Sequence, residues 1–284
     1  MTTDPLTLLK SQQREWAAGV GVEIDTTGYC LSCDANFFEP LSACARRDLA
    51  KGDGSELGKP GQRGKIQALH SSAALAVNVF DYWRGHDLRA LGQSFGLASR
   101  ICGLTFEHKF PTGLGGIAPN LDVVLSQCDG SVLAIESKFT EPFAKAKSKN
   151  FLKQKYFPND RGLWRHKGLS GCQTSAEDLR DDRVRFEFLD AAQLLKHMLG
   201  LASGDHPWKL CCLWYDAGGP ESARHSEELA LFSERLGPDS VKFTSMTYQA
   251  LFVRLSDLLR EAEEHKEYLT YLRARYFVGS EPNK

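Results

Sequence analysis

Apolar residues recur at helical spacing in some segments of the chain and form compact, strand-like runs in others. Helical spacing predicts an amphipathic helix of about four turns built on Ile66, Leu69, Ala73, Ala76, Val77 and Phe80. Further helices are expected over residues 188–201, 224–236 and 247–276, the last of them long and charged. Strands are expected over 101–110, in the two apolar runs of 119–139, and over 209–215 and 241–245. This order of elements predicts an α/β domain with a central mixed sheet flanked by helices.

The segment PNLDVVLSQCDGSVLAIESKF, residues 119–139, predicts a β-hairpin whose apolar strands carry charged side chains. Alternation along the second strand places Glu136 and Lys138 on one face. A three-residue loop over 128–130 sets Asp122 opposite Glu136, whereas a two-residue turn would move Asp122 to the other face. Glycine in the last loop position suits the left-handed residue that the longer loop needs, so we predict the three-residue loop.

The predicted cluster of charges has the composition of a phosphodiester hydrolysis site. Two carboxylates held close together repel each other unless a cation neutralises them, and Mg2+ commonly takes one or two protein carboxylates, several waters and phosphate oxygens. Asp122 and Glu136 are therefore the predicted ligands of Mg2+, for which Mn2+ could substitute. Lys138 would orient the attacking water or stabilise charge on the phosphate. The alternative is an ordinary network of surface charges on an edge hairpin.

The triplet Glu-x-Lys occurs three times in the chain, at residues 107–109, 136–138 and 264–266. The last copy lies in a helical pattern, where residues two apart do not share a face. Only the middle copy follows an Asp-bearing apolar strand and a tight turn, and this context singles it out.

Asn120-Leu121-Asp122 followed by Glu136-Ser137-Lys138 resembles the signature of the PD-(D/E)xK phosphodiesterases, which have the restriction-endonuclease-like fold. The order of elements over about residues 65–216 is similar to the core of that family. Residues 69–75, LHSSAAL, look like the first helix of a little-characterised bacterial subgroup. The proline that usually precedes the Asp directly is displaced here to Pro119. The resemblance implies a metal-dependent DNA endonuclease of restriction or defence type.

The resemblance also implies further site residues. Members of the family often carry a Glu near the first helix or on the first strand as an additional metal ligand, and Glu56 and Glu107 are the candidates here. The helix between the third and fourth strands often contributes Gln or Lys, which implies catalytic roles for Gln193 and Lys196 on one helix face. The alternatives are a solvated loop charge for Glu56 and a polar helix edge for the pair on the helix.

A local basic segment follows the hairpin. From Lys145 to Lys167, eight Lys or Arg residues stand against one acid, Asp160, with aromatic residues interleaved. Such a segment could track a phosphate backbone, its aromatics either stacking on bases or anchoring the segment to the core. The predicted nucleic-acid contacts are Lys145, Lys147, Lys149, Lys153, Lys155, Arg161, Arg165 and Lys167. The alternative is a solvated charged insertion. His166 and His197 are interpreted as ordinary polar residues.

Composition narrows the classes of protein only slightly. The formal net charge is −1, so any nucleic-acid surface must be local. No apolar run is long enough to predict a membrane span, and the N-terminus does not predict a secretory signal. The eight scattered cysteines are expected to be reduced thiols of a cytoplasmic protein. Zinc at Cys30, Cys33 and Cys44 is not expected, because a fourth ligand is missing nearby.

The sequence predicts an N-terminal extension or cap over residues 1–60 and a PD-(D/E)xK nuclease-like domain over 61–284. The second region would carry a basic insertion at about 140–187, and helical additions would flank the core at both ends. The predicted activity is metal-dependent hydrolysis of DNA, with RNA or branched DNA left open. The alternatives are a catalytically inactive nucleic-acid-binding or interaction module of the same fold, and a structural α/β domain. A homodimer also stays open, because enzymes that cut both strands of a duplex often work as dimers.

Overall fold

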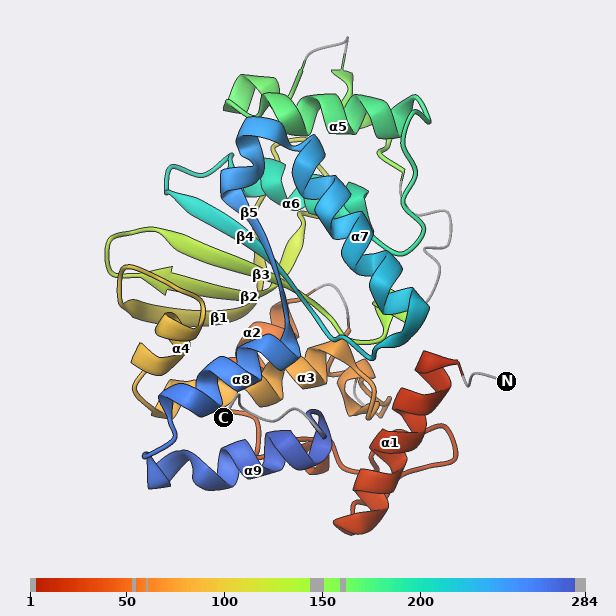
Figure 1. Cartoon of the computed structure of the whole chain (residues 1–284), viewed down its shortest axis with the longest axis vertical. Helices are drawn as coiled ribbons and strands as arrows, with labels where there is room; N and C mark the ends of the chain where they lie inside the picture. Colours follow the sequence, from red (N-terminus) through yellow and green to blue (C-terminus); the bar gives the residue numbers. More distant parts are fainter. Residues whose placement is uncertain (1–3, 53–54, 60, 144–150, 159–161, 279–284) are drawn as a thin grey trace.

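A mixed sheet forms the centre of the computed structural model, which describes residues 4–52, 55–59, 61–143, 151–158 and 162–278. Its strands lie in the order β1-β2-β3-β4-β5, as Figure 1 shows. The strands are β1 (Ile101–Lys109), β2 (Asn120–Gln127), β3 (Val132–Lys138), β4 (Trp208–Trp214) and β5 (Phe243–Thr247). The first three are antiparallel neighbours, whereas β3, β4 and β5 run parallel to one another.

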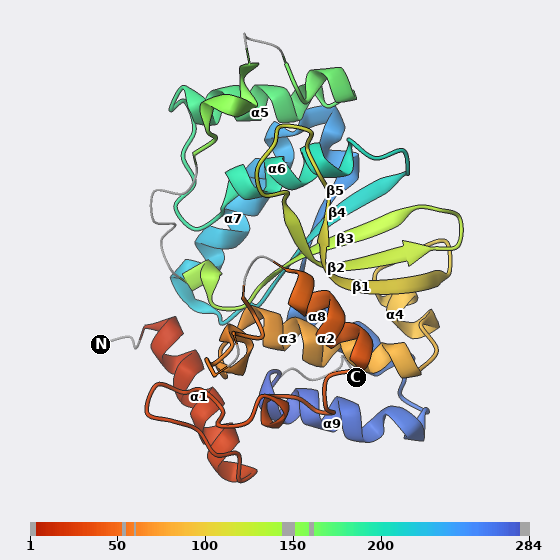
Figure 2. The ribbon, with the colours of Figure 1, turned by 180° about the vertical axis from the view of Figure 1, so that it is seen from behind.

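Helices cover both faces of this sheet (Figures 1 and 2). One face carries α5 (Ser170–Arg180), α6 (Ala191–Leu201) and α7 (Gly219–Arg235). The other side holds α1 (Pro5–Gly19), α2 (Ala43–Lys51), α3 (Ser72–Phe80), α4 (Arg89–Ser94), α8 (Tyr248–Leu258) and α9 (Lys266–Arg275). The predicted α/β class with a central mixed sheet flanked by helices is therefore confirmed.

The alternation predicted for β3 sorts its side chains between the two apolar clusters. Leu133, Ile135 and Phe139 join the cluster on the α3 and α8 side of the sheet. Ala134 joins the cluster that contains α6. Because Glu136 follows Ala134 by two residues, its side chain lies on the same face of β3 and faces α6.

Two predicted helices differ from the observed ones. The helix expected over residues 66–80 begins only at Ser72, because the Ser71 hydroxyl accepts a hydrogen bond from the Ala74 backbone N and caps it. The long helix expected over 247–276 is instead α8 and α9, separated by a short turn. This break lets Tyr268 of α9 fold back and stack on Tyr82 at a ring-centroid distance of 3.9 Å.

The basic insertion predicted at about 140–187 contains α5, which packs through Cys172, Ala176 and Leu179 into the apolar cluster on its side of the sheet. At the N-terminus, Leu9 and Leu49 belong to the same apolar cluster as the sheet. None of the helices among the described residues has both the length and the apolar character needed to cross a membrane.

A glycine sets how closely α6 approaches the sheet. A Cβ atom on Gly200 would lie 2.5 Å from the carbonyl oxygen of Phe110, which follows β1 directly. We expect Gly200→Ala to lower the free energy of unfolding by about 1–3 kcal/mol, because the backbone on one side must shift. Urea denaturation followed by circular dichroism measures the change.

Gly92→Ala in α4 is the matched control, since its new Cβ would lie 3.6 Å from Ile101 Cδ1, an ordinary contact. This variant should be as stable as the wild type or slightly more stable, because alanine favours helix over glycine. Equal stability of the two variants would contradict the proposed close approach.

Candidate active site

The hairpin between β2 and β3 has the predicted three-residue loop. Val123 pairs with Ile135, so the next positions toward the candidate site, Asp122 and Glu136, stand opposite each other. Gly130, the last loop residue, has a φ of +83°, the left-handed conformation that this loop requires. The predicted register is therefore confirmed.

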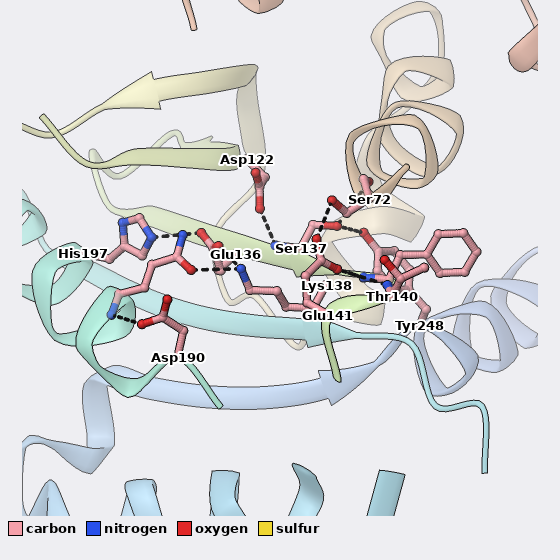
Figure 3. A network of polar contacts seen from close by, with 12 residues as sticks. Ser72, Asp122, Glu136, Ser137, Lys138, Thr140, Glu141, Asp190, His197 and Tyr248 are labelled. Atoms are coloured by element: carbon pink, nitrogen blue, oxygen red, sulfur yellow. Dashed lines mark hydrogen bonds and ion pairs between the residues drawn. The ribbon is translucent and has the colours of Figure 1, made fainter. Parts of the chain in front are cut away.

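The backbone pairing between β2 and β3 ends at Asp122 and Glu136. Beyond it, the carboxylate of Asp122, and not a backbone carbonyl, accepts the hydrogen bond from β3. The Ser137 backbone N donates a hydrogen bond of 2.6 Å to Asp122 Oδ2, as Figure 3 shows. The Ser137 hydroxyl lies 2.6 Å from the hydroxyl of Tyr248, the fully buried first residue of α8. These two contacts hold the carboxylate of Asp122 in place where the pairing of β2 with β3 ends.

Glu136 and Lys138 form an ion pair, and a residue of α6 accepts a further hydrogen bond from the lysine. Glu136 is 2 % exposed, and the Lys138 ammonium donates hydrogen bonds to Glu136 Oε1 at 2.6 Å and to Gln193 Oε1 at 2.9 Å. Gln193 lies in the first turn of α6, where its backbone N donates to the carboxylate of the N-cap residue Asp190 at 2.8 Å. The helix cap thus positions Gln193, and Gln193 helps to position the lysine.

His197 also contacts this cluster, a contact that the sequence interpretation missed. Its Nε2 lies 2.9 Å from Glu136 Oε2, and both side chains are almost fully buried. The two groups are not aligned as a hydrogen bond, so within the described part of the chain Glu136 Oε2 and both ring nitrogens lack hydrogen-bond partners. His197 follows Gln193 by one helical turn on the same face, and this spacing was the available signal.

Burial and the neighbouring charges together shift the pKa values of the two carboxylates in opposite directions. Burial, together with the negative charge of Glu136, raises the pKa of Asp122 well above its usual range. Burial also acts to raise the pKa of Glu136, but the Lys138 ammonium and His197 outweigh it and lower that pKa to about 2. Burial acts to lower the pKa of Lys138, and the neighbouring carboxylates, Glu136 foremost, raise it overall. Glu136 and Lys138 are therefore a charged pair at neutral pH, and Asp122 carries the unrelieved repulsion.

Glu107 lies close enough to Asp122 for its charge to contribute to the raised pKa of that carboxyl. Its Oε2 accepts a hydrogen bond of 3.1 Å from the side-chain amide of Asn120. Glu107 has a φ of +50°, a conformation that costs a residue other than glycine about 1–3 kcal/mol and that clusters at functional sites. These features place Glu107 beside the carboxylate pair.

The other two predicted residues lie outside the cluster. Burial raises the pKa of Glu56, and the charges that act on it are those of Lys65 and Glu141, with Asp122 not among them. Lys196 lies on the same helix as Gln193 but lines a neighbouring groove. The family resemblance and the helical spacing did not separate these residues from the contacting ones.

The carboxylate pair suits a hard divalent cation. Within the described ranges, no three His, Cys, Asp or Glu side chains are grouped in a way that could hold a metal ion. Asp122 and Glu136 nevertheless supply hard oxygen donors, their charges repel each other, and Glu136 Oε2 is a buried acceptor that no described group satisfies by a hydrogen bond. These residues fit Mg2+, which is often held by one or two carboxylates and keeps several waters.

Half of the predicted nucleic-acid contacts can be placed. Lys145, Lys147, Lys149 and Arg161 lie outside the described residues. Lys153 and Lys155 line the groove beside the site. Arg165 and Lys167 are exposed in a short 3-10 turn that follows the anchoring residue Trp164.

The repulsion at Asp122 leads to a stability prediction. Asp122→Asn should raise the stability of the metal-free protein by about 0.5–2 kcal/mol, since relieving an unfavourable functional site commonly stabilises a fold. The amide oxygen can still accept from Ser137, while the repulsion from Glu136 is removed. Thermal unfolding in EDTA measures this change.

Asp129→Asn in the hairpin loop is the matched control. The Asp129 carboxylate accepts hydrogen bonds from the backbone N and the hydroxyl of Ser131, and these bonds lower its pKa. Removing that charge should leave stability unchanged or reduce it slightly. A melting temperature of Asp122→Asn below that of the wild type would refute the repulsion argument.

Comparison with known families matches residues 20–277 to one family model. No protein with a curated description and no solved structure matches the chain. The matched range contains the whole sheet and the cluster formed by Asp122, Glu136 and Lys138. The mixed sheet flanked by helices is the restriction-endonuclease-like fold that the signature implied. The chain belongs to the family described as Restriction Endonuclease associating with ARP.

Proposed function

We propose that this protein is a metal-dependent nuclease that hydrolyses phosphodiester bonds in DNA. The observation that carries the proposal is the Lys138 ammonium, which Glu136 and Gln193 hold on the α6 side of the sheet, with its charge acting on Asp122. Membership in a family of restriction endonucleases supports a nuclease-type activity, with nucleic acid as the partner.

Each side chain has a role that follows from its position. Asp122 and Glu136 would hold the metal ion, with Glu107 as a third carboxylate close by. Mg2+ bound there would neutralise the carboxylates and polarise the scissile phosphate. Lys138 would orient the attacking water or stabilise the charge that develops on the phosphate. Gln193 would keep the lysine ammonium directed into the site through its 2.9 Å hydrogen bond.

The proposed site would determine how the bond is broken, whereas the surrounding surface would select the nucleic acid. DNA is the proposed substrate because the family description names restriction endonucleases. The same description names an association with ARP, so we propose a partner protein as a component of the working enzyme.

The proposal predicts cleavage that depends on both the metal ion and the lysine. Supercoiled, linear duplex and single-stranded DNA are incubated with the protein in the presence of Mg2+, Mn2+ or EDTA. Each reaction is run with the chain alone and again with the proposed ARP partner added. Wild type should cleave only with metal. Lys138→Ala should lose at least about 100-fold in rate, the usual effect of removing one group that stabilises a transition state.

Lys266→Ala is the control, because Lys266 belongs to another Glu-x-Lys triplet and its side chain is 71 % exposed. Its cleavage rate should equal that of the wild type. Binding without cleavage by the folded wild type, with and without the partner, would favour the non-catalytic module instead.

A further inference from the structure

An open groove of about 480 Å³ adjoins the carboxylate pair. Gln193 and His197 form its boundary with the candidate site, since they contact Lys138 and Glu136 respectively. The groove is lined by the loop before β2, the first residue of β2, the segment after the hairpin and α6. A ligand in this groove would therefore lie next to the reacting phosphate.

The charge of the groove is positive. Lys153, Lys155 and Lys196 line it, and no lining residue is acidic. The Lys155 ammonium donates to the carbonyl of Gly115 at 2.9 Å and so ties the loop before β2 to this segment. Lys153 and Lys196 form no ion pair with any described residue, which leaves their charges available to an anion.

Exposed apolar side chains accompany these charges. Phe151 is 62 % exposed and Ile117 is 76 % exposed, and both line the groove. The neighbouring side chains Leu152, Tyr156 and Trp164 are buried, so they anchor the basic segment to the core. Phe151 does not share that anchoring role, and its ring is accessible from the groove.

His197, one of the residues that line the groove, has an unsatisfied polar atom. His197 is 2 % exposed, and its Nδ1 has no hydrogen-bond partner among the described residues. Burying such a group without a partner costs about 1–3 kcal/mol. A phosphate, sugar or base atom in the groove would offer a partner.

We propose that this groove holds an unpaired nucleotide of the strand that is cut. The base packs against Phe151 and Ile117, and its phosphates lie near Lys153 and Lys196. A base inside a duplex is already stacked on both faces, so only an unpaired base offers a face to an aromatic ring. This inference rests on the proposed nuclease function and narrows its substrate to nucleic acid with a single-stranded segment beside the scissile phosphate.

Binding in EDTA tests the proposal without requiring cleavage. Fluorescence anisotropy compares a blunt duplex, the same duplex with a single-stranded extension, and the single strand alone. Wild type should prefer the two probes with unpaired bases. Phe151→Ala should bind those probes about 5- to 100-fold more weakly, the usual effect of removing one stacking ring, and should bind the blunt duplex as the wild type does.

Phe151→Trp and Val241→Ala are the control variants. Tryptophan preserves the stacking surface, so Phe151→Trp should retain the preference. Val241 is 72 % exposed and does not line the groove, so Val241→Ala should bind all probes as the wild type does. Lys196→Ala should reduce the slope of log affinity against log salt concentration by about 1, as expected for one lost phosphate contact.

The outcomes separate this inference from the proposed activity. A wild type that prefers unpaired bases and loses the preference in Phe151→Ala supports the groove proposal, even if no probe is cleaved with Mg2+. Equal affinity for blunt and extended duplexes, unchanged in Phe151→Ala, overturns it even if cleavage is observed. Failure to bind any of the probes overturns it as well.

Discussion

The burial of the Glu136 carboxylate is the constraint on which the rest of the candidate site depends. A carboxylate that is 2 % exposed loses its hydration, and the cost of several kcal/mol must be offset by nearby positive charge and hydrogen bonds. Lys138 supplies the charge from the same strand, and Gln193 and His197 complete the surroundings from α6. The helix must therefore dock tightly over β3, which the close approach of Gly200 to the backbone of Phe110 allows.

Asp122 shows the opposite balance. Its carboxylate is held by a backbone hydrogen bond from Ser137 and stands near Glu136 and Glu107, whose charges raise its pKa. The fold thus maintains a repulsion that a core without a function would avoid. Strain at Glu107, with its φ of +50°, lies in the same place. The repulsion between the carboxylates is what the proposed Mg2+ would relieve.

The two layers of helices divide the work around the hairpin. On one side, Ser137 contacts Tyr248 of α8 and fixes the backbone that holds Asp122. On the other side, α6 contributes polar groups to the ion pair and forms one wall of the basic groove. The same helix therefore connects the candidate catalytic residues to the surface where we propose that the nucleotide binds.

Sequence alone predicted the strands, the hairpin and the residues at the centre of the candidate site. Strand alternation and the glycine at the end of the loop are local properties, so they were sufficient to set Asp122 opposite Glu136 and to place Lys138 on the same face as Glu136. The class of fold followed from the order of elements in the same way. Helix boundaries were less accurate, because the cap at Ser71 and the reversal before α9 depend on contacts that periodicity does not encode.

Only the tertiary structure decided which distant residues meet the hairpin. The contact between Ser137 and Tyr248 spans 111 residues, and the one between Lys138 and Gln193 spans 55. Such contacts depend on the docking of whole helices, which local spacing does not specify. For the same reason, the family resemblance offered Glu56 as well as Glu107, and helical spacing placed Lys196 on the same face as Gln193. The sequence also gave Phe151 the same description as the buried aromatics. Packing separated them, because it alone determines which side chains share a buried space and which face the solvent.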